Sequence, residues 1–140
     1  MRFEDFITSK KVRRGNPDIQ LAKSLVKMSD NHLKSIEYMK LTETSSATIM
    51  TNYYESLREV VEAIAAIDGY KVYSHEAFTH FLREKGEDII SIKFDNYRKI
   101  RNSVNYYGKT VEVGITAANT EEIKRMIYQL KEKYLKRILG

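Results

Sequence analysis

The sequence predicts an all-α protein, an up-and-down four-helix bundle with one short extra helix between the second and fourth long segments. Its apolar side chains recur at intervals of three and four residues, which is the period of an amphipathic helix. Only one proline and six glycines interrupt the 140 residues. The length suits one domain, so we expect a basic N-terminal arm over residues 1–15 and a single helical bundle domain over residues 16–140.

The arm is strongly basic and lacks a long apolar pattern. We therefore expect it to be mobile or to form a short helix, with a net charge of +3. Its five basic and two acidic residues are Arg2, Lys10, Lys11, Arg13 and Arg14, against Glu4 and Asp5.

The first long helix is predicted to begin at residues 16–18. Asn16 offers an acceptor to the free N–H groups of a helix start, Pro17 has no N–H to leave unpaired, and Asp18 suits the positive end of the helix. One apolar stripe carries this helix to about Lys40. The stripe consists of Ala22, Val26, Leu33 and Ile36.

A turn rich in serine and threonine over residues 42–46 separates this helix from the second long one. Asp68 and Gly69 end the second helix. Ser74 is positioned to cap a short third helix, which Gly86 ends. The stripe of the second helix consists of Ala47, Met50, Tyr54, Leu57, Val61 and Ile64.

The fourth helix is predicted from Glu87 to about Tyr107, with Gly108 as its terminator. The pattern blurs over residues 109–119, which we interpret as a loop. Residues 119–122 resemble a capping box and predict the start of the final helix. Its apolar stripe consists of Ile123, Ile127, Leu130, Tyr134 and Ile138.

Composition narrows the functional classes. The chain has no cysteine, which excludes disulfide scaffolds, thiolate metal sites and cysteine nucleophiles. The net charge of +5 and the isoelectric point of about 9.3 favour acidic partners such as nucleic acid. No apolar stretch is long enough to cross a membrane and the first residues are charged, so we expect no membrane association, no signal peptide and a cytoplasmic location.

The histidines do not predict a metal site or a cofactor. His75 and His80 are five residues apart, whereas two zinc ligands on one helix face stand four apart. We expect both to be exposed polar positions on the short helix, and His32 to lie at the edge of the first stripe. The glycine patterns of phosphate-binding loops and of esterases are also missing from the sequence.

The fourth helix carries the strongest chemical signal. On a helical projection one arc, which includes Tyr97 and Tyr107, faces the core, and Arg101 borders it. Residues 91–111 hold five basic side chains and one acid. Guanidinium groups bind phosphate, amides bind base or ribose edges, and tyrosines stack on bases. The candidate residues for binding nucleic acid or a nucleotide are Arg98, Arg101, Asn102, Asn105, Tyr107 and Lys109.

The run from Asn96 to Gly108, NYRKIRNSVNYYG, resembles HEPN domains, especially small stand-alone prokaryotic or archaeal members. The stretch from Gly69 to Glu76 before the short helix is also similar to these proteins. The resemblance implies a four-helix bundle that forms a homodimer and cuts RNA without metal, through an arginine, a polar residue and a histidine four to six residues after the arginine. Arg101 and Asn102 match the first two positions.

The histidine of that signature is missing. Tyr106, Tyr107 and Gly108 occupy the places where it would fall, so Tyr106 is the candidate third catalytic residue beside Arg101 and Asn102. Imidazole exchanges protons near neutral pH, whereas the tyrosine side chain ordinarily ionises near pH 10 and is a poor base. Phosphate binding therefore survives this substitution better than RNA cleavage does.

Three hypotheses follow. The first is a HEPN-like homodimer that binds RNA or a nucleotide, with nuclease activity weak or lost. The second is an active metal-free endoribonuclease, the toxin of a toxin–antitoxin pair whose partner is a nucleotidyltransferase, as the resemblance implies. Either Tyr106 or Tyr107 would then orient the 2′-OH, or His75 would replace the missing histidine. The third is a non-catalytic helical adaptor in which Arg101 is an interface residue.

Overall fold

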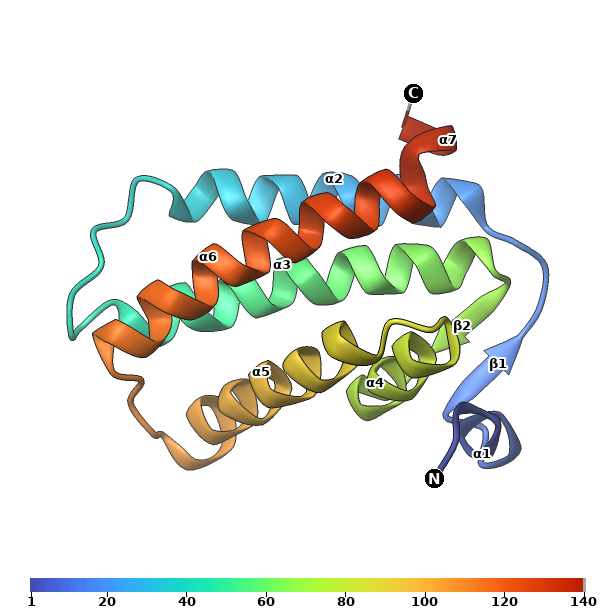
Figure 1. Ribbon diagram of the computed structural model, residues 1–140, viewed down its shortest axis with the longest axis horizontal. Coiled ribbons are helices and arrows are strands. Elements are labelled where there is room, and N and C mark those ends of the chain that lie inside the picture. The colour runs from blue at the N-terminus through green and yellow to red at the C-terminus, as the bar shows by residue number, and fades with distance from the viewer. Residues whose placement is uncertain (140) are drawn as a thin grey trace.

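The computed structural model describes residues 1–139, which are predominantly helical, as expected, with one small sheet of two strands (Figure 1). Four helices are long, and shorter elements lie at the two ends of the chain and between α3 and α5. In chain order the elements are α1 (Phe3–Thr8), β1 (Val12–Arg14), α2 (Ile19–Ile36), α3 (Ser46–Ile67), β2 (Tyr70–Val72), α4 (His75–Glu84), α5 (Asp88–Tyr107), α6 (Val113–Leu130), a π-helical segment (Lys131–Leu135) and α7 (Lys136–Leu139).

Helix α3 is the centre of the molecule. It contacts α2, α4, α5 and α6, and Figure 1 shows it running between α2 and α6 on one side and α5 on the other. Its seam residues Met50, Tyr54, Leu57 and Val61 are all fully buried. Burying a leucine or valine side chain stabilises a fold by about 1.5–3 kcal/mol. The apolar stripe predicted for this helix is therefore its core face.

Helix α2 begins at Ile19, directly after the predicted start segment of residues 16–18. The N-cap is Asp18, whose carboxylate accepts a hydrogen bond from the Leu21 N–H at 3.0 Å. Asn16 and Pro17 precede the helix, because the N–H of Asp18 already donates to the carbonyl of Ala66. At the other end the helix stops at Ile36 rather than at about Lys40.

The prediction of a loop over residues 109–119 is wrong in its second half, because α6 already begins at Val113. The residues of the expected capping box lie within the helix. The buried stripe continues upstream of Ile123 through two buried threonines, Thr116 and Thr120, which a search for apolar residues does not register. The Ser46 hydroxyl donates to the Thr116 hydroxyl at 2.7 Å and joins the starts of α3 and α6.

The two-stranded sheet was not predicted, since strands of three residues are too short to show an alternating pattern. β1 and β2 are antiparallel, with Val12 opposite Val72. Next to the sheet the Gly15 N–H donates to the Gly69 carbonyl, and a Cβ on Gly69 would lie 2.4 Å from the Gly15 oxygen. Only glycine permits this close approach.

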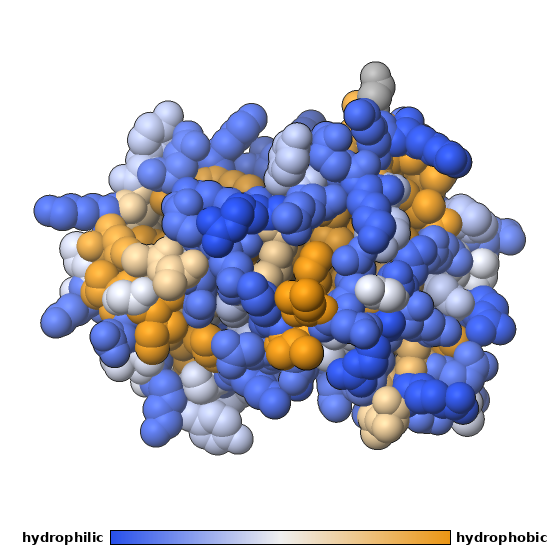
Figure 2. Space-filling model, in the orientation of Figure 1, coloured by the Kyte–Doolittle hydropathy of each residue, from blue (hydrophilic) through white to orange (hydrophobic). Residues whose placement is uncertain are grey.

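The N-terminal residues pack on the helices. Phe3 and Phe6 are buried, and the Phe3 ring lies 5.0 Å from the Tyr70 ring and 5.4 Å from the Phe81 ring between centroids. Hydrophilic side chains cover most of the face shown in Figure 2, with apolar atoms gathered near its centre and at its left end. Among residues 1–139 no helix is long and apolar enough to span a lipid bilayer.

Candidate functional site

A cluster of charged side chains lies where α3, α4 and α5 meet. It contains three arginines, Arg58 on α3 and Arg98 and Arg101 on α5, although neighbouring positions on both helices are core residues. Three carboxylates accompany them, so the charges balance. The acidic members are Glu55, Glu62 and Asp95.

Arg101 is held more loosely than its neighbours. Its side chain is 18% exposed, so it borders the core as the sequence predicts. One terminal nitrogen donates to the Asn102 amide oxygen at 3.0 Å and to the Tyr106 hydroxyl at 3.4 Å. The Nε atom lies 3.6 Å from the nearer oxygen of Glu55, which is too long for a hydrogen bond, and within the described residues no acceptor serves it.

The other two arginines have close carboxylate partners. Arg58 donates to Glu55 at 3.1 Å and also pairs with Glu62. Arg98 donates from Nε to Asp95 at 2.9 Å, and one of its terminal nitrogens forms an ion pair with the same oxygen. Arg98, a predicted binding residue, therefore has fewer free donors than its position in the sequence suggests.

Asp95 is held in its ionised form. Burial raises the pKa of its carboxyl, but hydrogen bonds from Arg98 and from the Thr79 hydroxyl outweigh burial and bring the pKa below its usual value. Since Asp95 is on α5 and Thr79 on α4, the same carboxylate fixes Arg98 and joins the two helices. Both effects reduce the freedom of Arg98 to bind a ligand.

The last turn of α5 and the residues just after it carry the remaining predicted residues. Asn102 is half-buried, whereas Asn105, Tyr106, Tyr107 and Lys109 are exposed. The expectation that Tyr107 faces the core is wrong: it is 76% exposed, because the chain turns away at Gly108, which adopts a left-handed conformation. The Arg101 guanidinium lies 5.7 Å from the centre of the Tyr106 ring.

His75 enters this cluster from the start of α4. It is half-buried rather than exposed as expected, and its Nδ1 lies 2.9 Å from the Tyr54 hydroxyl. Burial, followed by the charges of Arg58 and Arg101, lowers the pKa of His75 to about 4. The imidazole is thus neutral at pH 7. Burial also raises the pKa of Tyr54 above its usual value, so its hydroxyl stays protonated.

Four members of the cluster were not anticipated as site residues: Glu55, Arg58, Glu62 and Asp95. The neighbouring Tyr54 was treated only as part of the apolar stripe. The available signal was the segment from Glu55 to Glu62 on α3, in which charged residues fall close to the core stripe. Charged residues at a core boundary are uncommon unless they are paired, and pairing across helices is invisible in a sequence.

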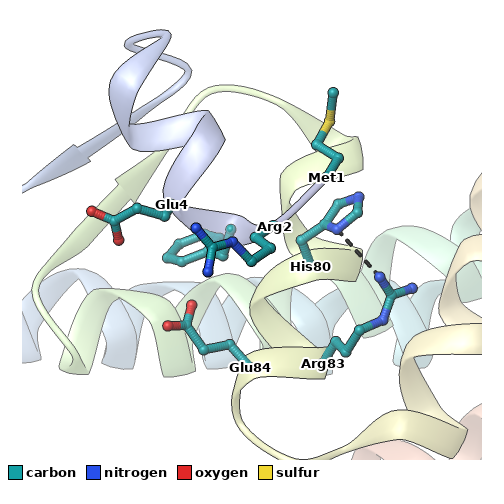
Figure 3. A pocket seen from close by; sticks show the side chains of 7 residues that line it. Met1, Arg2, Glu4, His80, Arg83 and Glu84 are labelled. Atoms are coloured by element: carbon teal, nitrogen blue, oxygen red, sulfur yellow. Dashed lines mark hydrogen bonds between the residues drawn. The ribbon is translucent and has the colours of Figure 1, made fainter.

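The remaining histidines lie elsewhere. Nδ1 of His32 is 2.6 Å from the buried carboxylate of Glu59, at the edge of α2 as expected. His80 faces a hollow of about 450 Å³ and lies 3.5 Å from an Arg83 nitrogen (Figure 3). Both carboxylate and cationic side chains line this hollow: its residues are Met1, Arg2, Phe3, Glu4, His80, Arg83 and Glu84.

None of the residues predicted to bind nucleic acid lines that hollow, and its mixture of charges does not favour one sign of ligand. Over residues 1–139 there is no group of three histidine or carboxylate side chains placed to hold a metal ion. The Arg101 cluster therefore offers the clearer chemistry: a guanidinium with an unserved donor beside a neutral imidazole.

Comparison of the chain with family models, with curated proteins and with solved structures found no match.

Proposed function

We propose that this protein is a HEPN-like homodimer, built as a four-helix bundle, that binds RNA or a nucleotide and has weak or no nuclease activity. The observation that carries the proposal is the state of Arg101. Its ion pair with Glu55 is long, and its Nε proton has no acceptor within the described chain. A buried donor without an acceptor costs about 1–3 kcal/mol.

A phosphate oxygen suits this position. The Nε atom itself is buried, so the phosphate first meets the exposed part of the guanidinium. When the side chain turns from Glu55 to the phosphate, it gains a charge-assisted hydrogen bond that the free protein lacks. Asn102 and Tyr106 already hold the guanidinium, and the exposed amide of Asn105 and the ring of Tyr107 stand nearby on α5 to meet a ribose or base. Lys109 adds positive charge at the same end of the helix.

The test is a fluorescence anisotropy titration with single-stranded RNA at moderate salt. We expect Arg101→Ala to weaken binding about tenfold, as for the loss of one charge-assisted hydrogen bond. Arg125→Ala, an exposed arginine on α6, is the matched control and should change the affinity less than twofold. If Arg101→Ala binds as tightly as the parent chain, Arg101 is not the phosphate site.

The position of His75 favours a second function, a metal-free endoribonuclease. A neutral imidazole can take the proton of a ribose 2′-OH as that oxygen attacks the phosphorus and Arg101 stabilises the phosphate charge. The bond from phosphorus to the 5′ oxygen then breaks, and the leaving oxygen takes a proton from water. The protein would then be a toxin whose partner is a nucleotidyltransferase. Incubation of the purified protein with total RNA and a chelator tests this. Cleavage that is lost in both Arg101→Ala and His75→Gln supports it, and absence of cleavage by the parent chain excludes it.

The pair between Arg101 and Glu55 favours a third function, an adaptor in which the arginine supports the helix surface that a partner contacts. In that case Arg101→Ala dissociates the dimer, and the parent chain binds no RNA. Sedimentation of parent and variant, run beside the anisotropy titration, separates this outcome from the first two.

A further inference from the structure

The outer face of the β1–β2 ribbon places two cations directly opposite each other. Val12 lies across from Val72 and is buried, while the next pair, Arg13 and Lys71, is exposed. Because neighbouring side chains of a strand alternate between faces, Arg13 and Lys71 share the face that points away from the helices. Like charges directly opposite each other destabilise a strand pair.

Neither cation is neutralised inside the protein. Among the described residues no carboxylate forms an ion pair with Arg13 or Lys71. Arg14, on the other face, is different: it lies 3.6 Å from a Glu4 oxygen, and its guanidinium is 5.9 Å from the centre of the Tyr70 ring. Positive charge is compensated on the inner face of the ribbon and left uncompensated on the outer face.

The same face continues by one residue pair. The Tyr73 N–H donates to the Lys11 carbonyl at 2.8 Å, which extends the register, so Lys11 and Tyr73 join the side of the ribbon that carries Arg13 and Lys71. Tyr73 is 60% exposed. We call these four residues, Lys11, Arg13, Lys71 and Tyr73, the ribbon face.

A hollow of about 140 Å³ lies beside the ribbon face, with Arg13 and Lys71 in its lining. Asn16 and the backbone of Gly15 and Gly69 form other parts of its wall. The carboxylate in its lining, Asp18, is already engaged as the N-cap of α2. Two uncompensated cations therefore meet at a concave surface large enough for a phosphate group.

We propose that the ribbon face binds the backbone of a single-stranded nucleic acid, with Arg13 and Lys71 on a phosphate and an unpaired base stacked on Tyr73. Cations that follow the backbone and an exposed aromatic ring that stacks a base are the two elements of single-strand binding. A base in a duplex is not free to stack on Tyr73, which favours a single strand. The proposal does not depend on Arg101, because β1 and β2 lie at the opposite end of the molecule from the last turn of α5 (Figure 1).

The test is the affinity for a labelled oligonucleotide of about 12 nucleotides, long enough for one site of this kind. We expect Arg13→Gln/Lys71→Gln to weaken binding about tenfold at low salt and to reduce the slope of log K against log salt by about 1.4, the value for two lost phosphate contacts on a single strand. Thermal unfolding of this variant should occur at the parent temperature or above, because a repulsive pair is removed.

Lys34→Gln/Lys40→Gln is the matched control, since it removes the same charge from two exposed lysines, one in the last turn of α2 and one just beyond its end. It should weaken binding less than threefold. Tyr73→Phe should keep the parent affinity and Tyr73→Ala should lose about tenfold, as expected for one stacked base. The proposal is overturned if the ribbon variant binds like the parent, or if it loses no more affinity than the control.

Two further titrations fix the class of ligand. RNA and DNA oligonucleotides of one sequence show whether the ribbon face senses the ribose 2′-OH, and either result is compatible with phosphate binding. Polyglutamate of similar length is the contrasting polyanion. Tighter binding of polyglutamate than of RNA, with no effect of Tyr73→Ala on either, would overturn a nucleic-acid site in favour of an acidic protein partner.

Failure of this proposal and failure of the function proposed for Arg101 are separable. Loss of RNA affinity in Arg101→Ala with parent affinity in Arg13→Gln/Lys71→Gln leaves only the α5 site, and the reverse pattern leaves only the ribbon face. If both bind the same strand, the two losses add in log K when the variants are combined, because the sites share no residue.

Discussion

The ribbon face and the Arg101 cluster both contain arginine, but the surroundings of its charge are opposite. In the cluster each arginine has an acidic neighbour, and Glu55 lies near both Arg58 and Arg101. On the ribbon face the nearest cross-strand neighbour of Arg13 is another cation. An anion must compete with a carboxylate at the first site, whereas at the second it relieves a repulsion. The free-energy cost of binding an anion to arginine is therefore higher in the cluster than on the ribbon face.

The largest expected effect comes from disrupting the support of the ribbon. Gly69→Ala should destabilise the protein by about 2–4 kcal/mol, because the new Cβ would meet the Gly15 carbonyl and the backbone φ is +90°. Gly86→Ala is the control: its φ is +85°, but no atom lies within 4 Å of the added Cβ, so it should cost about 1 kcal/mol. Denaturant unfolding measures both, and equal losses would show that the contact with Gly15 does not matter.

The next effect is a pH dependence of the unfolding free energy that arises from His75 in the Arg101 cluster and not from the ribbon face. The folded pKa of His75, about 4, lies below the unfolded value of about 6.5, so between these values the unfolded chain binds more protons. The stability contributed by neutral His75 is therefore complete above about pH 6.5 and is lost as the pH falls towards 4. After allowance for the solvent exposure of the ring we expect about 1 kcal/mol.

His75→Gln should lack this part of the pH dependence, so the measurement is the difference between parent and variant in unfolding free energy from pH 4 to pH 7. An anion bound beside Arg101 should also raise the pKa of His75, seen as a shift in its NMR titration with inorganic phosphate. Arg13→Gln/Lys71→Gln should leave that shift unchanged. A shift that requires the ribbon face would contradict the separation of the two sites.

A smaller effect should follow when an acidic neighbour is removed from the arginines of the cluster, so that their charge is less compensated, as on the ribbon face. Glu55→Gln removes the carboxylate shared by Arg58 and Arg101, so we expect RNA affinity to rise about threefold while stability falls by about 1 kcal/mol. Glu62→Gln serves as the control, since it removes an acid that pairs with Arg58 and, among the described residues, forms no ion pair with Arg101. Unchanged affinity in Glu55→Gln would mean that Glu55 does not compete with the ligand.

The smallest effect concerns the two faces of the ribbon. Arg13→Gln should raise the unfolding free energy by about 0.3 kcal/mol by removing a like-charge pair, and Arg14→Gln should lower it by a similar amount by removing its contacts with Glu4 and Tyr70. Urea unfolding at low salt resolves the sign, and high salt should reduce both changes. Changes of the same sign in the two variants would argue against this difference between the faces.

Local signals account for the parts of the fold that the sequence analysis predicted correctly. The ends of α4 and α5 at Gly86 and Gly108 follow from backbone conformation, and the buried stripe of α3 follows from helical spacing. The start of α6 was missed because Thr116 and Thr120 are core residues whose hydroxyls are satisfied by nearby partners. Burial of a polar side chain depends on those partners, so composition alone did not indicate it.

The sequence by itself determined the helical class, the position of most helices and the placement of Arg101 at a core boundary, because these depend on residues a few positions apart. Only the tertiary structure decided which charges face each other. It brings His75, Glu55 and Arg101 together from three helices, and it sets Arg13 opposite Lys71 on two paired strands that are far apart in the sequence. Interaction between charges depends on their separation and burial in space, and for distant segments these are set by how the whole chain packs.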